Sequence, residues 1–259
     1  KRMLPFFILM LPYLALFLLL IDNAGTIIQA VVTRNIGSLV SLIGFALGFV
    51  VIAIIVGLIT LYLNTLVVEN SKRYWQGSKE KGTQNASMHR LLSEERKAIK
   101  GTYFNAFIAT VAVTVISFIA GMIPIIGGIL GIIVGLIFFT YLPACVLNKT
   151  NGLKESYDIF MNNKLETFVF WIVFGVISIV FVLIAFIPAF IALFVAAGGS
   201  LVTALTTGAG FSAVFTAIKS NLLIVVIGGI ISAFLLAFVT IFDTSARTMY
   251  YLQVSKKKH

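Results

Sequence analysis

Long uncharged, apolar runs dominate this chain, and their lengths predict helices that cross a membrane. Between Glu166 and Lys219 there is no charged side chain, and 101–148 is a second run of this kind. A bilayer core is about 30 Å thick, so a helix needs about 20 apolar residues to cross it. Helices satisfy their own backbone hydrogen bonds, whereas a transmembrane β-barrel needs short segments of alternating polarity. The pattern predicts an all-α, polytopic transmembrane helical bundle, with 1–259 as a single transmembrane domain.

Six spans account for these runs. A tight turn at Pro124, Gly127 and Gly128 divides 101–148 into two spans. The six are expected at 3–21, at about 38–66, twice within 101–148, from 167 to Pro188, and at about 222–242, where the helix continues toward Gln253.

The basic residues predict how these spans are oriented. With six spans, all of the 19 lysines and arginines except Arg34 and Lys219 fall on one side. Cytoplasmic loops of membrane proteins are enriched in Lys and Arg, so this side and both termini are predicted to be cytoplasmic. A seven-span alternative, in which 189–218 crosses the membrane, places Arg247 and Lys256–Lys258 outside, against this rule.

Six spans leave 189–220 as an outer segment that does not cross the membrane. It is predicted to re-enter the membrane or to lie along its outer interface, with bends at Gly198–Ser200 and at 208–210. Apolar residues recur at helical spacing within Phe211–Ile218, with Lys219 beside them, which is typical of an interfacial amphipathic helix.

The longest polar segment, 69–100, is predicted to be a cytoplasmic loop. Residues 70–86 are polar and expected to be flexible, and an amphipathic helix is expected from Ser87 onward. We interpret this helix as resting on the inner leaflet, with a docking site for a partner as the alternative.

Composition agrees with a membrane protein and points to its partners. Hydrophobic residues make up 60% of the chain and charged residues 11%, compared with about 25% charged residues in soluble domains. The net charge of +10 is gathered at the ends of the apolar runs. It therefore predicts membrane lipids with anionic headgroups as partners, and no nucleic acid. A homo-oligomer or another membrane protein remains open as a protein partner. The expected location is the cell membrane, plasma or inner.

Residues suited to enzyme chemistry are scarce. His89 and His259 are the only histidines and Cys145 is the only cysteine, so no intrachain disulfide and no metal-ligand cluster is predicted. No nucleophile stands near a base in the sequence. The inner carboxylates, among them Glu155 and Asp158, are expected to be solvated partners of nearby lysines. We expect no enzyme activity, no catalytic residue, no metal and no cofactor.

Asp243 and Arg247 stand four residues apart at the inner end of the last span. An acid that precedes a base by four residues forms a favourable ion pair on a helix. Two interpretations remain open: a structural pair at the membrane interface, or a gate or lipid-headgroup contact, since ionisable residues in spans are often functional.

Further candidate polar positions lie on the third span and before two other spans. Thr110, Thr114 and Ser117 form one stripe, which favours helix packing, with a polar pathway as the alternative. Arg34 and Lys219 precede spans two and six at corresponding outer positions. Internal repetition is also indicated, because Lys100–Phe104 aligns with Lys164–Phe168 at the same offset that aligns Pro124 with Pro188. Three related hairpins are therefore predicted.

A sequence pattern between 103 and 253 resembles that of a known superfamily. Its parts are Pro143–Val146, Asn151–Leu153 with Ser156, Asn162–Lys164, and a closing Ala246…Tyr250-Tyr251. The pattern is similar to the membrane domains of glycerophosphoryl diester phosphodiesterase-like proteins and of YciC-like inner-membrane proteins. Such proteins often carry an acidic residue where Asn148 and Lys149 stand here. The resemblance implies six helices and does not cover a catalytic phosphodiesterase domain.

Two function hypotheses follow. The first is a non-enzymatic membrane protein that handles lipid or another amphiphile, or that scaffolds a membrane complex. The alternative is a transporter or channel for a small or hydrophobic solute. Ion coupling is not expected, because no acidic residue lies in the middle of a span. A hydrated path lined by Thr110, Thr114 and Ser117 would favour the second hypothesis.

Overall fold

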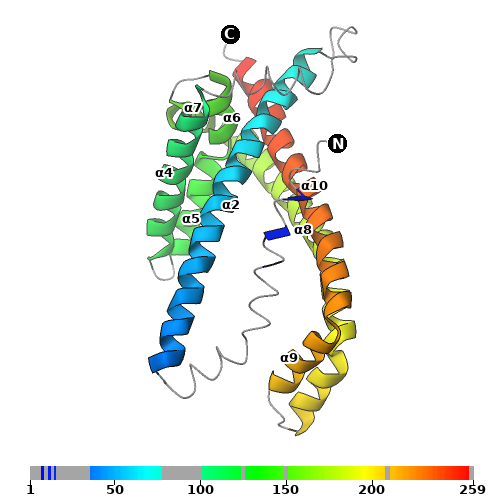
Figure 1. Cartoon of the computed structure of the whole chain (residues 1–259). Helices are drawn as coiled ribbons and strands as arrows, with labels where there is room; N and C mark the ends of the chain where they lie inside the picture. The colour runs from blue at the N-terminus through cyan, green and yellow to red at the C-terminus, as the bar shows by residue number, and fades with distance from the viewer. Residues whose placement is uncertain are drawn as a thin grey trace. The chain divides into compact units, whose positions relative to one another are not determined.

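The computed structural model describes residues 7–8, 11–12, 15, 36–77, 101–123, 126–148, 151–207 and 211–256. Over these ranges the chain forms helices joined by short turns, without a strand, which confirms the predicted all-α class. The helices are α2 (Ile36–Gly77), α4 (Tyr103–Gly121), α5 (Gly127–Ile137), α6 (Tyr141–Asn148), α7 (Gly152–Asn162), α8 (Lys164–Thr207), α9 (Phe211–Ser220) and α10 (Leu222–Ser255) (Figure 1).

Five segments within these ranges are helical, long and apolar enough to cross a membrane. They are Ala46–Trp75, Tyr103–Gly121, Gly127–Asn148, Lys164–Val202 and Leu222–Ser255. In the most apolar stretch of each, only 11 to 39% of the residues are buried by the rest of the chain. Large apolar surfaces are stable against lipid but not against water. The five segments therefore indicate a multi-pass membrane protein and coincide with predicted spans two to six. The predicted first span lies mostly outside the described residues, so the count of six stays a prediction.

Helix α8 is longer than the sequence predicted. We expected the fifth span to end near Pro188 and a bend at Gly198–Ser200, but α8 continues to Thr207 with Pro188 inside it. The helix is therefore not interrupted at Gly198–Ser200, whereas the end of the fifth span stays a prediction. Residues 189–207 prolong α8, and the predicted amphipathic helix is present as α9. The position of 189–220 relative to a membrane remains a prediction.

A neighbouring side chain explains why the helix continues. Proline has no backbone N–H and disturbs the hydrogen bonds of the turn around it. Within lipid, an N–H group freed in this way needs another acceptor. The backbone N–H of Ala189 donates to the Ser232 hydroxyl oxygen on α10, at 3.0 Å.

Helix α2 also extends beyond its predicted limit. The predicted loop 69–100 begins inside this helix, because 69–77 are helical. Polar side chains support the added turns: Arg73 forms an ion pair with Glu69 at 3.6 Å, and the Asn70 side chain donates to the Leu66 carbonyl at 2.9 Å. The amphipathic helix expected from Ser87 lies outside the described residues.

The chain forms two compact units. The first comprises Lys1–Thr60 and Val180–Val239, and the second comprises Leu61–Ile179 and Thr240–His259. Within the first unit, α8 and α10 pack antiparallel through small residues, and Gly228 of α10 lies against Pro188 and Ala192 of α8. Helix α9 completes this unit with a buried cluster of Ala196, Ala197, Ile218 and Val225.

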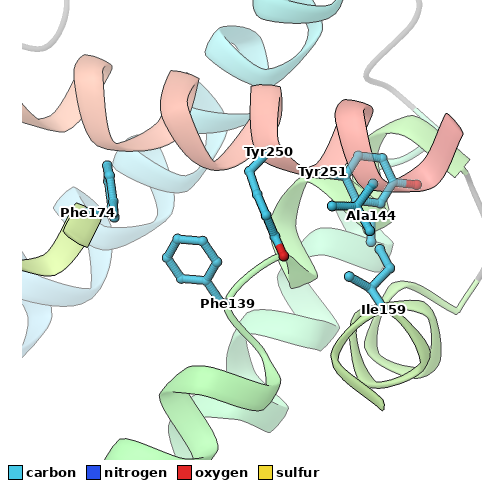
Figure 2. Packing of buried hydrophobic residues seen from close by; sticks show 7 residues of the cluster. Phe139, Ala144, Ile159, Phe174, Tyr250 and Tyr251 are labelled. Atoms are coloured by element: carbon cyan, nitrogen blue, oxygen red, sulfur yellow. The ribbon is translucent and has the colours of Figure 1, made fainter. Parts of the chain in front are cut away.

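Two buried clusters organise the second unit. One joins α2, α4 and α6, and its buried members are Val68, Ala106, Ala109, Cys145 and Val146. The other is rich in aromatic side chains and joins α6, α7, α8 and α10 around the turn between α5 and α6. Its buried members are Phe139, Ala144, Ile159, Phe174, Tyr250, Tyr251 and Val254 (Figure 2). The polar groups described next surround this aromatic cluster.

Candidate functional site

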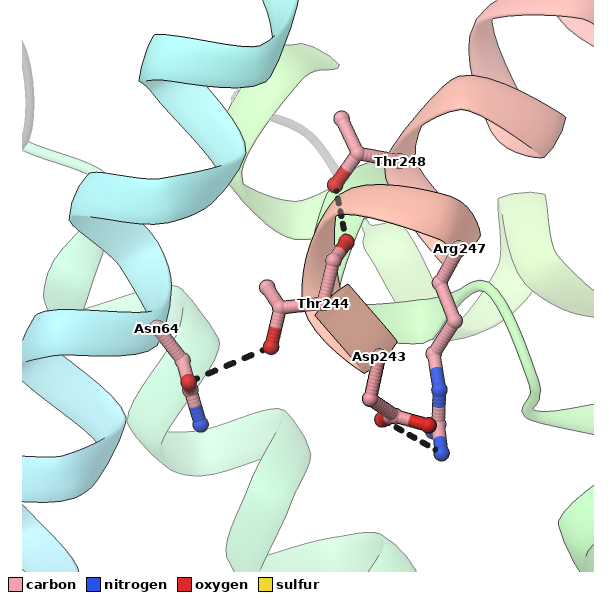
Figure 3. A network of polar contacts seen from close by, with 5 residues as sticks. All are labelled: Asn64, Asp243, Thr244, Arg247 and Thr248. Carbon is pink, nitrogen blue, oxygen red and sulfur yellow. Dashed lines mark hydrogen bonds and ion pairs between the residues drawn. The ribbon is translucent and has the colours of Figure 1, made fainter. Parts of the chain in front are cut away.

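The predicted ion pair is present at the edge of the aromatic cluster. An Nη2 atom of Arg247 lies 2.9 Å from an Oδ2 atom of Asp243, one helical turn away on α10 (Figure 3). The Arg247 side chain is 36% exposed and that of Asp243 is 27% exposed. The pair is therefore only partly shielded, and its Coulomb attraction alone stabilises the fold by about 1 kcal/mol or less.

Two aromatic rings contact the guanidinium group of Arg247 in addition to the Asp243 carboxylate. Its Cζ atom lies 5.0 Å from the centre of the Phe139 ring and 5.9 Å from that of Phe174. Guanidinium groups stack favourably on aromatic faces because of the ring quadrupole. The Nε atom is buried and has no hydrogen-bond partner among the described residues. Arg247 thus links α10 with α8 and with the turn before α6.

A hydroxyl-rich face of α10 binds α2. The Thr244 hydroxyl donates to the Asn64 side-chain oxygen at 3.2 Å (Figure 3). The Ser71 hydroxyl donates to that of Ser245 at 3.2 Å, and the Thr248 hydroxyl donates to the Thr244 carbonyl at 2.7 Å. Thr244 and Thr248 are buried. The Thr244 and Ser245 bonds fix α10 against the polar end of α2, and the Thr248 bond lies within α10.

Tyr250 and Tyr251 close the end of α10. The hydroxyl groups of Tyr250 and Thr167 share a hydrogen bond of 2.7 Å, and the Tyr250 ring stacks on Phe170 at 4.3 Å. The Tyr251 hydroxyl donates to Glu155 Oε1 on α7 at 2.7 Å, and the other Glu155 oxygen accepts from the Asn148 amide. Glu155 is therefore bound to Tyr251 and Asn148, in place of the lysines that the sequence suggested, and it stays partly exposed.

Ser156 joins α7 to the turn between α5 and α6. Its hydroxyl donates to the Ile137 carbonyl at 3.0 Å and shares a 3.1 Å hydrogen bond with the Thr140 hydroxyl. Ser156 and Thr140 are both buried. The sequence resemblance had singled out Ser156 and the two tyrosines without indicating what they contact, and Glu155 was expected only as a solvated partner of lysines.

The predicted stripe on α4 is only partly connected to other helices. The Thr110 hydroxyl donates to the Ala106 carbonyl at 2.7 Å and lies 3.3 Å from the Tyr141 hydroxyl on α6. The Thr114 hydroxyl donates to the Thr110 carbonyl of its own helix at 2.8 Å, and its side chain is exposed. Ser117 is half-buried on the same helix.

The remaining predicted positions do not join this site. Lys219 lies at the exposed end of α9 and belongs to the first unit, whereas the ion pair belongs to the second. Arg34 lies outside the described residues. The structure therefore brings together Asp243 with Arg247, and Thr110 with Thr114.

The contacts described above hold neighbouring helices against one another. Within the described ranges, no three His, Cys, Asp or Glu side chains gather where they could hold a metal ion. Cys145 is a buried free thiol in the cluster shared with α2 and α4. Ion-pair, hydroxyl and tyrosine contacts connect the last part of α10 to α2, α7, α8 and the α5–α6 turn.

Comparison of the chain with protein-family models, with curated proteins and with solved structures finds no match. The resemblance to glycerophosphoryl diester phosphodiesterase-like and YciC-like membrane domains therefore stays an expectation from short sequence patterns.

Proposed function

We propose that this chain is a six-span protein of the cell membrane, with cytoplasmic termini, that handles lipid or another amphiphile without catalysing a reaction. One observation carries the proposal: large apolar side chains are exposed along the helices, whereas the polar side chains at the end of α10 are bonded to neighbouring helices.

Bulky apolar side chains are exposed along both units. They include Phe104, Phe118 and Met122 on or beside α4, and Ile187, Phe190, Ile191, Phe194 and Val195 on α8. Side chains of this size present ridges that fit between acyl chains, where dispersion contacts accumulate. In the first unit, Phe190, Ile191, Phe194 and Val195 are exposed on the part of α8 that follows Pro188.

The polar side chains favour lipid handling over a hydrated path. At the end of α10, hydroxyl, amide and carboxylate groups bond to neighbouring helices, so they support packing. The exposed Thr114 bonds to its own helix, as hydroxyl groups do when they face lipid. These contacts support the first sequence hypothesis rather than the transporter alternative.

Native mass spectrometry of the full chain released from a mild detergent tests the proposal. We expect discrete phospholipid adducts that survive collisional activation, and fewer of them in a Phe190→Ala, Phe194→Ala double variant. Thr114→Val, which changes an exposed polar position on α4, is the matched control and should leave the adducts unchanged. Absence of adducts, together with protein-dependent solute flux in proteoliposomes, would establish the transporter alternative instead.

Labelling of single cysteines tests the orientation separately. Six spans place Lys219 outside and Ser255 in the cytoplasm, so Lys219→Cys should react with an impermeant maleimide added to intact cells. Ser255→Cys should react only after the membrane is opened. Labelling of Lys219→Cys only from the cytoplasmic side would contradict the six-span proposal.

A further inference from the structure

Helix α7 is a short amphipathic helix between two spanning segments, and its inward face is firmly held. Gly152, Ser156 and Ile159 are buried on this face. An added Cβ atom at Gly152 would lie 2.5 Å from the Cys145 backbone nitrogen, so the helix begins in direct contact with α6. Glu155 and Ser156 then bind Tyr251 and Ile137, as described above.

The opposite face of α7 combines bulky apolar groups with lysines. Tyr157 is 45% exposed and Met161 is 42% exposed, while Leu165, just beyond the helix, is 77% exposed. Lys154 on α7 and Lys164, the first residue of α8, are also exposed. At the helical repeat of about 100° per residue, Lys154, Tyr157 and Met161 share one side, opposite the buried residues. We call these three residues, together with Lys164 and Leu165 at the start of α8, the α7 surface.

The charged members of the α7 surface are the two lysines, and both are more exposed than the neighbouring carboxylates. Asp158, four residues after Lys154, and Glu166 are half-buried, and Glu155 is bound by Tyr251 and Asn148. The exposed lysines are therefore available to an anionic group, although three carboxylates lie in the same segment. Tyrosine beside lysine and aliphatic side chains is typical of the lipid–water boundary.

The direction of α7 agrees with a position in that boundary. In Figure 2, α7 is seen nearly along its axis at Ile159, whereas α10 runs across the view. Helix α7 thus lies across the end of a helix that is apolar enough to span the membrane. A helix in this position, with an apolar outer face, is stabilised when that face enters the headgroup and acyl boundary.

We propose that the α7 surface binds the phospholipid headgroup layer at the cytoplasmic side of the membrane. Tyr157, Met161 and Leu165 enter the acyl boundary, and Lys154 and Lys164 bind lipid phosphate, with a preference for anionic phospholipid. The inference rests on the proposed placement of the chain in a membrane, and it assigns a specific lipid-contacting surface to that placement.

Fluorescent labels on single cysteines test this assignment in proteoliposomes of phosphatidylcholine with added phosphatidylglycerol. Tyr157→Cys and Met161→Cys place bimane on the α7 surface, and Asn162→Cys places it at an exposed position on the border of that surface. Cys145 is buried, so the chain without an added cysteine should not react and serves as the control for background labelling. We expect lipid-borne nitroxide to quench positions 157 and 161 more than 162, and aqueous iodide to do the opposite.

Charge substitution tests the lipid preference. Quenching by nitroxide phosphatidylglycerol should exceed quenching by nitroxide phosphatidylcholine, and Lys154→Gln with Lys164→Gln should abolish this difference. A lysine near an anionic surface strengthens binding to that surface roughly fivefold, so loss of both lysines should have a measurable effect.

Three outcomes overturn the assignment. Strong iodide quenching at 157 and 161 shows that the α7 surface faces water. Protection from both quenchers shows that a second copy or another protein covers it. Lipid quenching without any preference between the two phospholipids refutes the role of the lysines. Retained lipid adducts with a water-facing α7 would refute this inference alone, whereas a lipid-bound α7 without retained adducts would refute only the proposed function.

Discussion

Gly228 is the position at which one added methyl group should disturb the first unit most directly. This residue is buried on α10 where the helix crosses α8. An added Cβ atom would lie 2.7 Å from the Pro188 carbonyl oxygen and would also meet the Ala192 Cβ atom. Carbon atoms in normal contact are about 3.5 to 4.0 Å apart. The obstructing oxygen belongs to the backbone, so the two helices must separate.

The cost follows from the general energetics of overpacking. Inserting a methyl group into a close-packed contact costs about 1 to 3 kcal/mol. Replacing glycine by alanine in a helix gains about 0.5 to 1 kcal/mol where space permits. We therefore expect Gly228→Ala to lower the free energy of unfolding by about 1 to 2 kcal/mol, since the contact is with backbone and cannot be relieved by a rotamer change.

Denaturation by sodium dodecyl sulfate in mixed micelles, followed by circular dichroism, measures this effect. Gly199→Ala is the matched control, because a Cβ atom at this α8 position meets open space. Ala192→Gly in the Gly228→Ala background should restore part of the lost stability, since it removes one of the two obstructing groups. Equal midpoints for Gly228→Ala and Gly199→Ala would show that α8 and α10 do not cross closely at Gly228, and the packing argument would fail.

Three further substitutions test other contacts by the same midpoint measurement. Ser232→Ala removes the acceptor for an N–H next to the helix proline and should cost roughly 0.6 to 2 kcal/mol, with faster amide exchange at that N–H. Ser232→Thr should retain the bond. Tyr251→Phe leaves a Glu155 oxygen without its buried donor and should cost about 1 to 3 kcal/mol; an unchanged midpoint would argue against this bond. Arg247→Met should cost about 1 to 2 kcal/mol, from a partly exposed ion pair and two ring contacts, and Asp243→Asn should cost less because the ring contacts remain.

Local sequence patterns predicted the spans and one contact of the candidate site. The apolar runs identify the helices because length and hydropathy are properties of each segment by itself. Asp243 and Arg247 could be paired in advance because four residues on one helix are neighbours by construction. The amphipathic helix after 210 was predictable for the same reason.

Contacts between distant segments were not predictable in this way. Where α8 continues past Pro188, the N–H of Ala189 donates to Ser232, which belongs to another helix. The pairing of Tyr251 with Glu155 joins residues that are 96 positions apart. In both cases the local signal pointed elsewhere, because a proline usually ends a helix and an inner-face glutamate usually faces solvent. Only the tertiary arrangement supplies the partner that changes the outcome.

The two units combine close approach and polar bonds in different proportions. Between helices in lipid, apolar contact gives little advantage, because lipid tails are as apolar as the side chains. The remaining sources of specificity are close approach at small residues and hydrogen bonds between helices. The first unit uses close approach, with Gly228 against Pro188 and Ala192 and one serine bond at the proline. The second unit also contains a close approach, at Gly152 against Cys145, and adds hydroxyl, tyrosine and ion-pair contacts along the last part of α10. An added methyl group at Gly228 or at Gly152 should therefore be costly, and loss of a hydrogen-bond partner should be most costly in the second unit.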